Sequence, residues 1–269
     1  MEFLIACDLE GIHGVVGEPY QTLTDSFDYS LAVEGAVCEI NTAAKALFDQ
    51  GATKVLVWDN HGKNLNIDFS LLDPRVIRAD AKKYPVRGDF AKEHQIKGVV
   101  FLGYHAKEGA PNGVLAHTYS SKSIQYVKLN GKSIGELYID SRIWAAMGIK
   151  SIFHAGCHIS VAEMNAVCPE AVTVVTKYGE GRNRAVLRGR EEVLNDIYKG
   201  VTEAVRRLDE PITCTFPASA QLEVRYTRAE RTEEVMRKAQ QNGIPAAYGE
   251  DTHILRFEVS RPNQITMLL

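Results

Sequence analysis

Short, continuously apolar runs recur along the first two thirds of the chain, and longer segments with apolar residues at helical spacing separate them. A short apolar run is typical of a strand that is buried on both faces of a parallel sheet. The expected strands are residues 3–7, 54–58, 98–103, 151–156 and 171–177. The expected helices are residues 32–50, 90–94, 135–148, 161–167 and a long segment that ends near residue 208. Because strand–helix–strand units have right-handed crossovers, this order predicts an α/β fold with a mostly parallel sheet flanked by helices.

The last part of the chain predicts a smaller α/β unit. Its expected elements are a strand at 221–226, a helix at 229–241 and a strand at 253–259. We therefore expect a large α/β domain over residues 1–212 and a small C-terminal α/β appendage over residues 213–269. Within the large domain, Asn130-Gly131 predicts a β-hairpin over residues 124–134, since this dipeptide is the strongest short hairpin signal.

The first expected strand ends in two carboxylates, Asp8 and Glu10, and Gly11 follows them. Residues i and i+2 of an extended backbone point to the same side, so both side chains project together from the end of a buried strand. Two adjacent carboxylates repel each other unless a cation lies between them or one of them holds a proton. The pair therefore indicates either a polar strand end that faces solvent or a metal site.

The next two expected strands also end in residue types that bind metals. The second strand runs into Asp59-Asn60-His61-Gly62, and the third runs into Tyr104-His105. In an open parallel α/β sheet, sites form outside the carboxyl ends of the strands. A single histidine at such a place more often packs or makes a hydrogen bond. Three strand ends with ligating residues nevertheless favour a metal site at this edge of the sheet.

Composition and charge narrow the classes of function. The 269 residues are 45% hydrophobic and 24% charged, which is typical of a globular protein. A net charge of -3 argues against a general nucleic-acid or membrane-surface role, and no apolar run reaches the ~18 residues of a membrane span. The N-terminal residues do not predict a signal peptide. The five scattered cysteines have no CxxC spacing, which predicts free thiols and a cytoplasmic location.

Two more residues near these strand ends could carry chemistry. Glu136 begins the expected helix at 135–148, where an acid can simply complement the helix dipole by a few tenths of a kcal/mol. His117 lies in the glycine- and proline-bearing loop over residues 106–118. A long loop just past a ligand-bearing strand end is a common place for catalytic side chains.

The later part of the large domain contains weaker candidates. His154 lies inside the fourth strand and is expected in the core, whereas His158 lies at the strand end and could contact a substrate. The segment from Gly179 to Arg184 predicts a turn from a strand into a helix, and such a turn can hold an anion on helix amides. As a dinucleotide-binding fingerprint it is weak. Arg182 or Arg184 could bind a substrate carboxylate or could be a surface charge.

These motifs resemble those of the zinc-dependent D-aminopeptidases related to dipeptide-transport protein A, over nearly the whole chain. The matching blocks are Asp8-Leu9-Glu10-Gly11, Asp59-Asn60-His61-Gly62, Gly103-Tyr104-His105-Ala106, His117-Thr118, and Asn130-Gly131 followed by Gly135-Glu136. The metal ligands that the resemblance implies are Asp8, Glu10, His61, His105 and Glu136. It also implies that His117 is catalytic and that the chains form a ring-shaped homodecamer with enclosed active sites.

Three carboxylates and two imidazoles suit two divalent ions, here two zinc ions, with Asp8 as the bridging ligand. The implied activity is an aminopeptidase that removes the N-terminal residue, a D-amino acid by resemblance, from short peptides or aminoacyl amides. Metal-activated hydroxide would attack the carbonyl, and His117 would stabilise the oxyanion or protonate the leaving amine. The family usually has two acids after the fourth strand where this chain has Cys157-His158, which bears on the D preference.

Two alternatives remain open at this point. A dinuclear metal phosphoesterase could use the same ligands, and the segment from Gly179 to Arg184 is its additional support. A non-catalytic ring scaffold could hold a structural metal instead. Structural zinc prefers closed, cysteine-rich sites, and none of the cysteines has that spacing.

Overall fold

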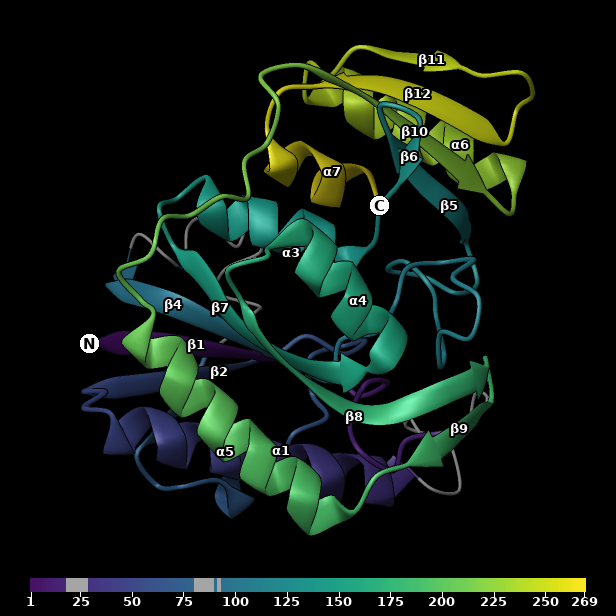
Figure 1. Ribbon diagram of the computed structural model, residues 1–269. Helices are drawn as coiled ribbons and strands as arrows, with labels where there is room; N and C mark the ends of the chain where they lie inside the picture. Colours follow the sequence, from purple (N-terminus) through teal and green to yellow (C-terminus); the bar gives the residue numbers. More distant parts are fainter. Residues whose placement is uncertain (18–28, 80–89, 91–92) are drawn as a thin grey trace.

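The computed structural model describes residues 1–17, 29–79, 90 and 93–269. Its main layer is a seven-stranded sheet (Figure 1). The strands are β1 (Glu2–Cys7), β2 (Lys54–Asp59), β3 (Val76–Arg78), β4 (Ile96–Leu102), β7 (Lys150–Cys157), β8 (Val172–Gly181) and β9 (Arg184–Leu187). They lie in the order β3, β2, β1, β4, β7, β8 and β9, and only the β8–β9 pair is antiparallel. The expected α/β fold with a mostly parallel sheet is therefore confirmed.

Helices cover both faces of this sheet. One face packs against α1 (Tyr29–Asp49) and α5 (Arg190–Arg206), and the other against α3 (Glu136–Ala145) and α4 (His158–Val167) (Figure 1). The side chains of β1 alternate between the two cores: Ile5 packs on the α1 side and Leu4 on the α3 side, and neither is exposed. Because β1 has no solvent face, its sequence reads as one continuous apolar run.

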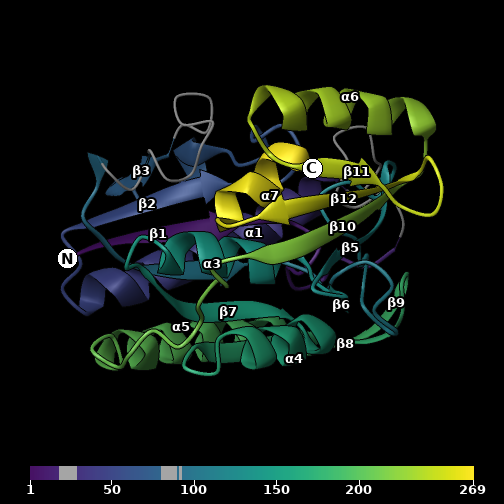
Figure 2. The same ribbon diagram turned by 90° about the horizontal axis from the view of Figure 1, so that it is seen from above.

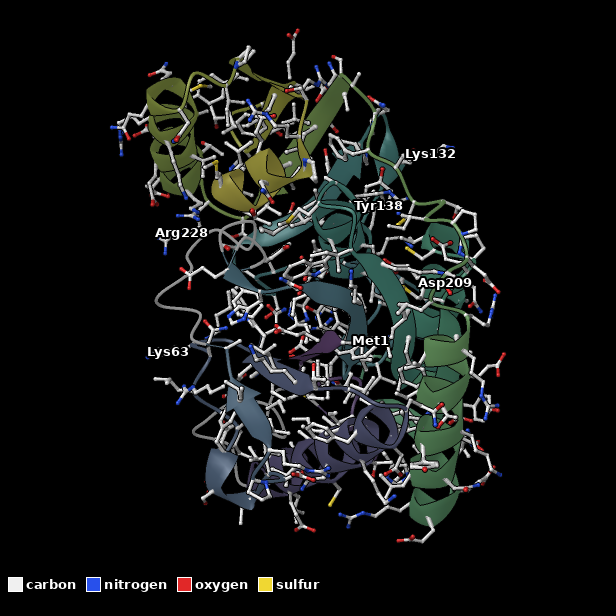
Figure 3. The ribbon with its side chains drawn as sticks, turned by 90° about the vertical axis from the view of Figure 1, so that its left-hand side faces the viewer. Met1, Lys63, Lys132, Tyr138, Asp209 and Arg228 are labelled. Carbon is white, nitrogen blue, oxygen red and sulfur yellow. The ribbon has the colours of Figure 1, made fainter. Side chains whose placement is uncertain are left out.

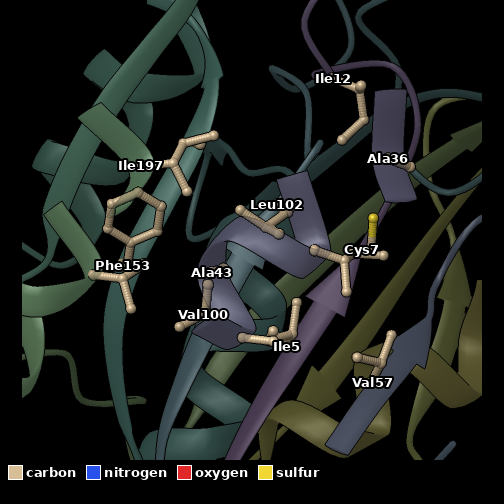
Figure 4. Close-up of a cluster of buried hydrophobic side chains, with 14 of the residues drawn as sticks. Ile5, Cys7, Ile12, Ala36, Ala43, Val57, Val100, Leu102, Phe153 and Ile197 are labelled. Carbon is tan, nitrogen blue, oxygen red and sulfur yellow. The ribbon is translucent and has the colours of Figure 1, made fainter. Parts of the chain in front are cut away.

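Interdigitated side chains make the central strands rigid. On the α1 side, Ile5, Val57 and Val100 come from three neighbouring strands and pack against Ala43 of α1 and Ile197 of α5 (Figure 4). Close packing of this kind holds the strands in a fixed register. The carboxyl ends of β2, β1 and β4 consequently lie side by side at one edge of the main sheet.

A second, antiparallel sheet lies beside the main one. Its strands, in order, are β11 (Ala246–Tyr248), β12 (Ile254–Val259), β10 (Ala220–Tyr226), β5 (Ile124–Leu129) and β6 (Lys132–Ser133). Two helices, α6 (Ala229–Gln241) and α7 (Pro262–Leu268), accompany it, and α6 lies on its outer side (Figure 2). The predicted strand–helix–strand order of the C-terminal region is confirmed, whereas β11 and α7 had no clear sequence signal.

The predicted hairpin belongs to this second sheet. Asn130 and Gly131 form its turn with φ values of 50° and 78°, and β5 pairs with β10 of the C-terminal region. Seen from the side, Lys132 at the start of β6 lies in the part of the molecule that holds the second sheet, away from Met1 beside β1 (Figure 3). The C-terminal residues thus do not complete their sheet alone. The division of the chain at residue 212 stays a prediction.

The segment from Gly179 to Arg184 is not a turn into a helix: β8 continues to Gly181 and forms a hairpin with β9, and α5 begins only at Arg190. The short helix expected at residues 90–94 lies partly outside the described residues. Among the helices that the structure describes, none is long and apolar enough to cross a membrane.

Candidate metal centre

Two glycines allow the ends of β1 and β4 to approach each other closely. The amide of Gly11 donates to the carbonyl of Gly103 at 2.6 Å, and a Cβ atom on Gly103 would lie 2.0 Å from the carbonyl oxygen of Asp8. Gly103 also has a φ of 70°, a region that favours glycine. The carboxylate-bearing end of β1 is therefore held against the strand end that carries His105.

Asp59 folds the loop that follows β2. Its carboxylate accepts hydrogen bonds from the backbone amides of Asn66 and His61 at 2.5 and 3.2 Å. This turn directs the His61 ring back toward β1, where its Nδ1 lies 2.9 Å from Oδ1 of Asp8 and 3.3 Å from Oε2 of Glu10. Asp59 itself lies outside the candidate ligand groups found among the described residues and acts by shaping the loop.

His105 presents its second ring nitrogen to the same pocket. Its Nδ1 lies 3.0 Å from the carbonyl of Ala106, and because a carbonyl only accepts, Nδ1 carries the proton. The buried Nε2 then faces Oδ2 of Asp8 at 3.6 Å and Oε1 of Glu136 at 3.3 Å. A backbone carbonyl behind the ring is the usual way in which proteins orient a metal-binding histidine.

Glu136 differs from an ordinary helix-terminal acid. It is the first residue of α3, yet its side chain is buried and its Oε1 accepts a hydrogen bond from the amide of Tyr119 at 2.8 Å. An acid that only complements a helix dipole has no reason to leave water. The position of Glu136 among the other carboxylates supports its predicted role as a ligand.

Asp8 belongs to two groups of potential ligands. The ligand atoms of Asp8, Glu10 and His61 lie within 4.8 Å of one another, and so do those of Asp8, His105 and Glu136. The structure thus brings together all five residues that the sequence predicts as ligands. Within the described residues, the buried Nε2 of His105 and Oε2 of Glu10 make no hydrogen bond. Carboxylate oxygens and imidazole nitrogens are ligand types that zinc binds.

The charges in the pocket compensate each other in the absence of metal. Burial opposes charge on His61 and His105, but the carboxylates around them raise the pKa of His61 to about 12 and that of His105 to about 10. Burial also opposes the Glu136 carboxylate, yet His105 lowers its pKa to about 2. Burial and the neighbouring Glu10 raise the pKa of Asp8 to about 7. Protons on the imidazoles thus supply the positive charge that a metal would otherwise supply.

His117 lies against the metal pocket on its loop. Its ring stacks on that of His105 with centroids 3.9 Å apart, and its Nδ1 lies 2.8 Å from the carbonyl of Leu115. Nδ1 therefore carries a proton, which leaves Nε2 as an acceptor in the neutral ring. Burial and the nearby His105 lower the pKa of His117. His117 also forms a third group of ligand atoms with Glu10 and His105, so the geometry alone allows either role.

The other two candidate histidines have structural partners. His154 is fully buried, its Nε2 lies 3.0 Å from Oγ of Ser160, and burial lowers its pKa to about 3, in agreement with the expected core position. His158 accepts a hydrogen bond at Nδ1 from the amide of Gly179 at 3.0 Å. His158 is also outside the ligand groups found among the described residues. Its predicted contact with substrate stays a prediction.

The β8–β9 hairpin supports the His117 loop. Gly179 allows close contact with that loop, since a Cβ atom there would lie 2.0 Å from the carbonyl oxygen of Asn112. The guanidinium of Arg182 donates to the carbonyl of Ala116, and the amide of Leu115 donates to the carbonyl of Arg182 at 2.9 Å. This segment therefore packs against the loop and does not form an anion-binding helix start.

A separate group of potential ligands lies away from this pocket. Cys168, Glu170 and Cys214 bring their donor atoms within 4.8 Å of one another, and all five cysteines of the chain are free. Both oxygens of Glu170 already accept hydrogen bonds from Thr213, and the guanidinium of Arg142 lies 3.8 Å from Sγ of Cys168. The guanidinium of Arg142 lies beside the thiol of Cys168, and both oxygens of the Glu170 carboxylate already make hydrogen bonds. This cluster is therefore better explained as structural than as a metal site.

Sequence analysis missed two residues that support the site. Thr176 and Lys177 of β8 bind backbone carbonyls of the loop after β1. The available signal was a lysine inside an otherwise buried strand, because lysine is almost never fully buried without partners.

Comparisons with known proteins agree with this geometry. The peptidase M55 family model, described as D-aminopeptidase, matches residues 1–261. A D-aminopeptidase of Bacillus subtilis (strain 168) is 27% identical over 181 residues, which span 66% of this chain and 64% of that relative. The solved structure of the Zn-dependent D-aminopeptidase DppA from Bacillus subtilis, a self-compartmentalizing protease, has a TM-score of 0.84 at 21% identity and covers 99% of this chain and 96% of that chain. This likeness confirms the fold.

Metal binding is expected to release protons. Because His61 and His105 hold protons in the metal-free pocket, about one to two protons per chain should leave when zinc binds near pH 7, and the apparent affinity should rise with pH. Isothermal titration calorimetry in buffers of different ionisation enthalpy measures this release. His158→Gln, outside the pocket, should leave it unchanged. A binding enthalpy that is the same in every buffer would contradict the charge compensation described above.

Proposed function

Because the chain belongs to the M55 family of D-aminopeptidases, we propose that it is a zinc-dependent aminopeptidase that removes the N-terminal residue, a D-amino acid, from short peptides or aminoacyl amides. The observation that carries the proposal is the pair of ligand groups that share Asp8. A buried pocket of three carboxylates and two oriented imidazoles suits metal-assisted hydrolysis.

We propose that the site holds two zinc ions. Asp8 would be shared between them, with Glu10 and His61 on one ion and His105 and Glu136 on the other. When bound, zinc supplies Lewis-acid activation of water and of the substrate carbonyl. The name of the related DppA structure, a Zn-dependent enzyme, supports the choice of metal.

His117 is proposed as the residue that moves protons. With its Nδ1 proton committed to the carbonyl of Leu115, neutral His117 can only accept at Nε2. It can therefore take a proton from the attacking water and return it to the leaving amine. Once protonated it can also donate a hydrogen bond to the developing oxyanion. Burial and the neighbouring His105 lower its pKa, which favours the neutral form that can accept a proton.

The two alternative functions lose their support. The phosphoesterase interpretation relied on an anion-binding turn at residues 179–184, and that segment is a hairpin that contacts the His117 loop. The scaffold interpretation requires a closed structural metal. The pocket instead offers carboxylate oxygens and imidazole nitrogens as metal ligands. It also lies next to His117, whose Nε2 can accept a proton.

The D preference and the assembly are further parts of the proposal. Where the family usually has two acids after the fourth strand, this chain has Cys157, which is fully buried, and His158, whose Nδ1 accepts from the amide of Gly179. We propose that the D-residue is recognised here without those two acids. We also propose a ring-shaped homodecamer, supported by the description of the related DppA as self-compartmentalizing.

The activity can be tested directly. D- and L-aminoacyl p-nitroanilides and p-nitrophenyl phosphate should be assayed side by side with added zinc. We expect hydrolysis of the D-aminoacyl substrates, loss of this activity after dialysis against a chelator, and recovery with zinc. Turnover of the phosphate ester alone, or no peptidase activity in zinc-loaded protein, would refute the proposed function.

Glu136→Gln tests the ligand assignment. Loss of a ligand carboxylate should lower the zinc content from about two ions per chain and abolish activity. Mass spectrometry of the metal content measures the first effect. Glu230→Gln in the first turn of α6 is the matched control, because that acid is exposed. Full zinc occupancy, with only the few tenths of a kcal/mol of a helix-terminal charge lost, would show that Glu136 is not a ligand.

His117→Ala tests the proton-transfer role. The variant should keep its zinc content and fold, while kcat falls by roughly 10²–10⁴, the range for losing a general acid–base or oxyanion group. Steady-state kinetics and metal analysis on the same sample give both values. His253→Ala, in the turn before β12, serves as the control for loss of a histidine elsewhere. Unchanged kcat/KM, or loss of one zinc ion per chain, would rule out the assignment.

A further inference from the structure

A single ammonium group binds three backbone carbonyls of the loop that carries Glu10. The Nζ atom of Lys177 lies 2.7 Å from the carbonyl oxygen of Glu10, 2.6 Å from that of Ile12 and 2.7 Å from that of Val15. A lysine ammonium has three N–H donors, and all three are used here. Lys177 itself is fully buried in β8.

Two neighbouring side chains bind the rest of this short loop. The hydroxyl of Thr176 donates to the carbonyl of Gly11 at 2.8 Å, and the carboxylate of Glu39 in α1 accepts from the amide of His13 at 2.7 Å. Irregular backbone that is buried must find partners for its polar groups. In this loop, side chains of β8 and α1 supply the hydrogen-bond partners that other backbone groups would supply in a regular strand or helix.

The burial of Lys177 needs an explanation, because moving an ammonium out of water is costly. An apolar side chain of the same length would avoid this cost but would take the ammonium donor away from three buried carbonyls. Among the described residues, only the carbonyl of Ile12 also accepts from a backbone amide, that of Val15 at 3.2 Å. The three carbonyls converge on one point, where the three donors of a single ammonium reach all of them. One of the three belongs to Glu10 itself, so the contact fixes the backbone from which the carboxylate projects.

We propose that Lys177 is a positioning residue that fixes the loop carrying Glu10 and thereby sets the affinity of the site for zinc. This inference rests on the proposed zinc site. Lys177 acts through the backbone, since its ammonium binds carbonyl oxygens of the loop and not the ligand carboxylates. Without it, the three carbonyls would turn toward other donors and the Glu10 side chain would move with them. Loss of a group that orients a ligand typically lowers metal affinity by roughly 10–100-fold.

The chain contains a matched control for a merely structural role. Lys150, at the start of β7, is also buried, and its ammonium donates to the carbonyls of Arg207 and Glu210 at 2.7 and 2.9 Å. It lies at the amino end of the parallel sheet, whereas the metal pocket lies at the carboxyl ends. Lys177→Met and Lys150→Met both remove a buried ammonium from backbone carbonyls. Both should lower the thermal unfolding temperature.

Only Lys177→Met should change the metal site. Zinc affinity, measured by competition with a chromophoric chelator, should fall by roughly 10–100-fold in this variant and stay at the wild-type value in Lys150→Met. Hydrogen exchange of the metal-free protein should be faster at residues 9–15 in Lys177→Met alone. Equal zinc affinity in the two variants, or unchanged exchange over residues 9–15, would overturn the proposal.

If Lys177→Met does not fold, two less disruptive substitutions of Thr176 test the role of the same loop. Thr176→Val removes the hydroxyl bound to Gly11, and Thr176→Ser retains it. Zinc affinity should fall in the valine variant and recover in the serine variant, and equal affinities would count against control by this loop. These measurements do not depend on catalysis. Zinc binding without peptidase activity would refute the proposed function and leave Lys177 testable, whereas a wild-type chain that binds no zinc would refute both.

Discussion

Repulsion among three buried carboxylates is the constraint on which the rest of the structure depends. Asp8, Glu10 and Glu136 are each at most 5% exposed. Two unit charges about 4 Å apart interact by roughly 4 kcal/mol at an effective dielectric constant of about 20. A domain is stable by only about 5–15 kcal/mol in total, so repulsion on this scale cannot be left uncompensated. Positive charge must enter the pocket, either as protons on imidazole rings or as a metal ion.

The fold meets this requirement by bringing carboxylates and imidazoles together from three strand ends and one helix start. Asp8, His61 and His105 follow three adjacent parallel strands, and Glu136 begins a helix on one face of the sheet. The tight contact at Gly103 brings two of these strand ends together. The proposed ligands thus lie at or just beyond the ends of regular elements, while His117, which is proposed to move protons, lies on a longer loop that the β8–β9 hairpin supports.

Strands and site residues could be predicted from the sequence where the local residue pattern and the position of the residues along the chain indicate the same structure. Apolar runs predicted the strands, and polar residues just beyond them predicted the edge at which Asp8, His61 and His105 meet. The β8–β9 hairpin was predicted wrongly, because glycine and arginine after a strand are also typical of a turn into a helix. Gly179 is needed there for contact with Asn112, which is distant in sequence. The roles of Thr176 and Lys177 were likewise hidden, since their partners lie more than 160 residues earlier in the chain.

The hairpin that joins the two sheets has a consequence for how the chain folds during synthesis. β5 and β6 leave the ribosome well before β10, the strand with which β5 pairs, and β6 leads directly into the helix that begins with Glu136. The second sheet therefore cannot close until the last fifth of the chain has emerged. Until then, the segment that anchors Glu136 lacks its strand partner. Completion of the pocket that Glu136 shares with Asp8 is thus tied to the synthesis of β10, so a nascent chain that lacks this strand does not yet hold the proposed ligands in their final arrangement.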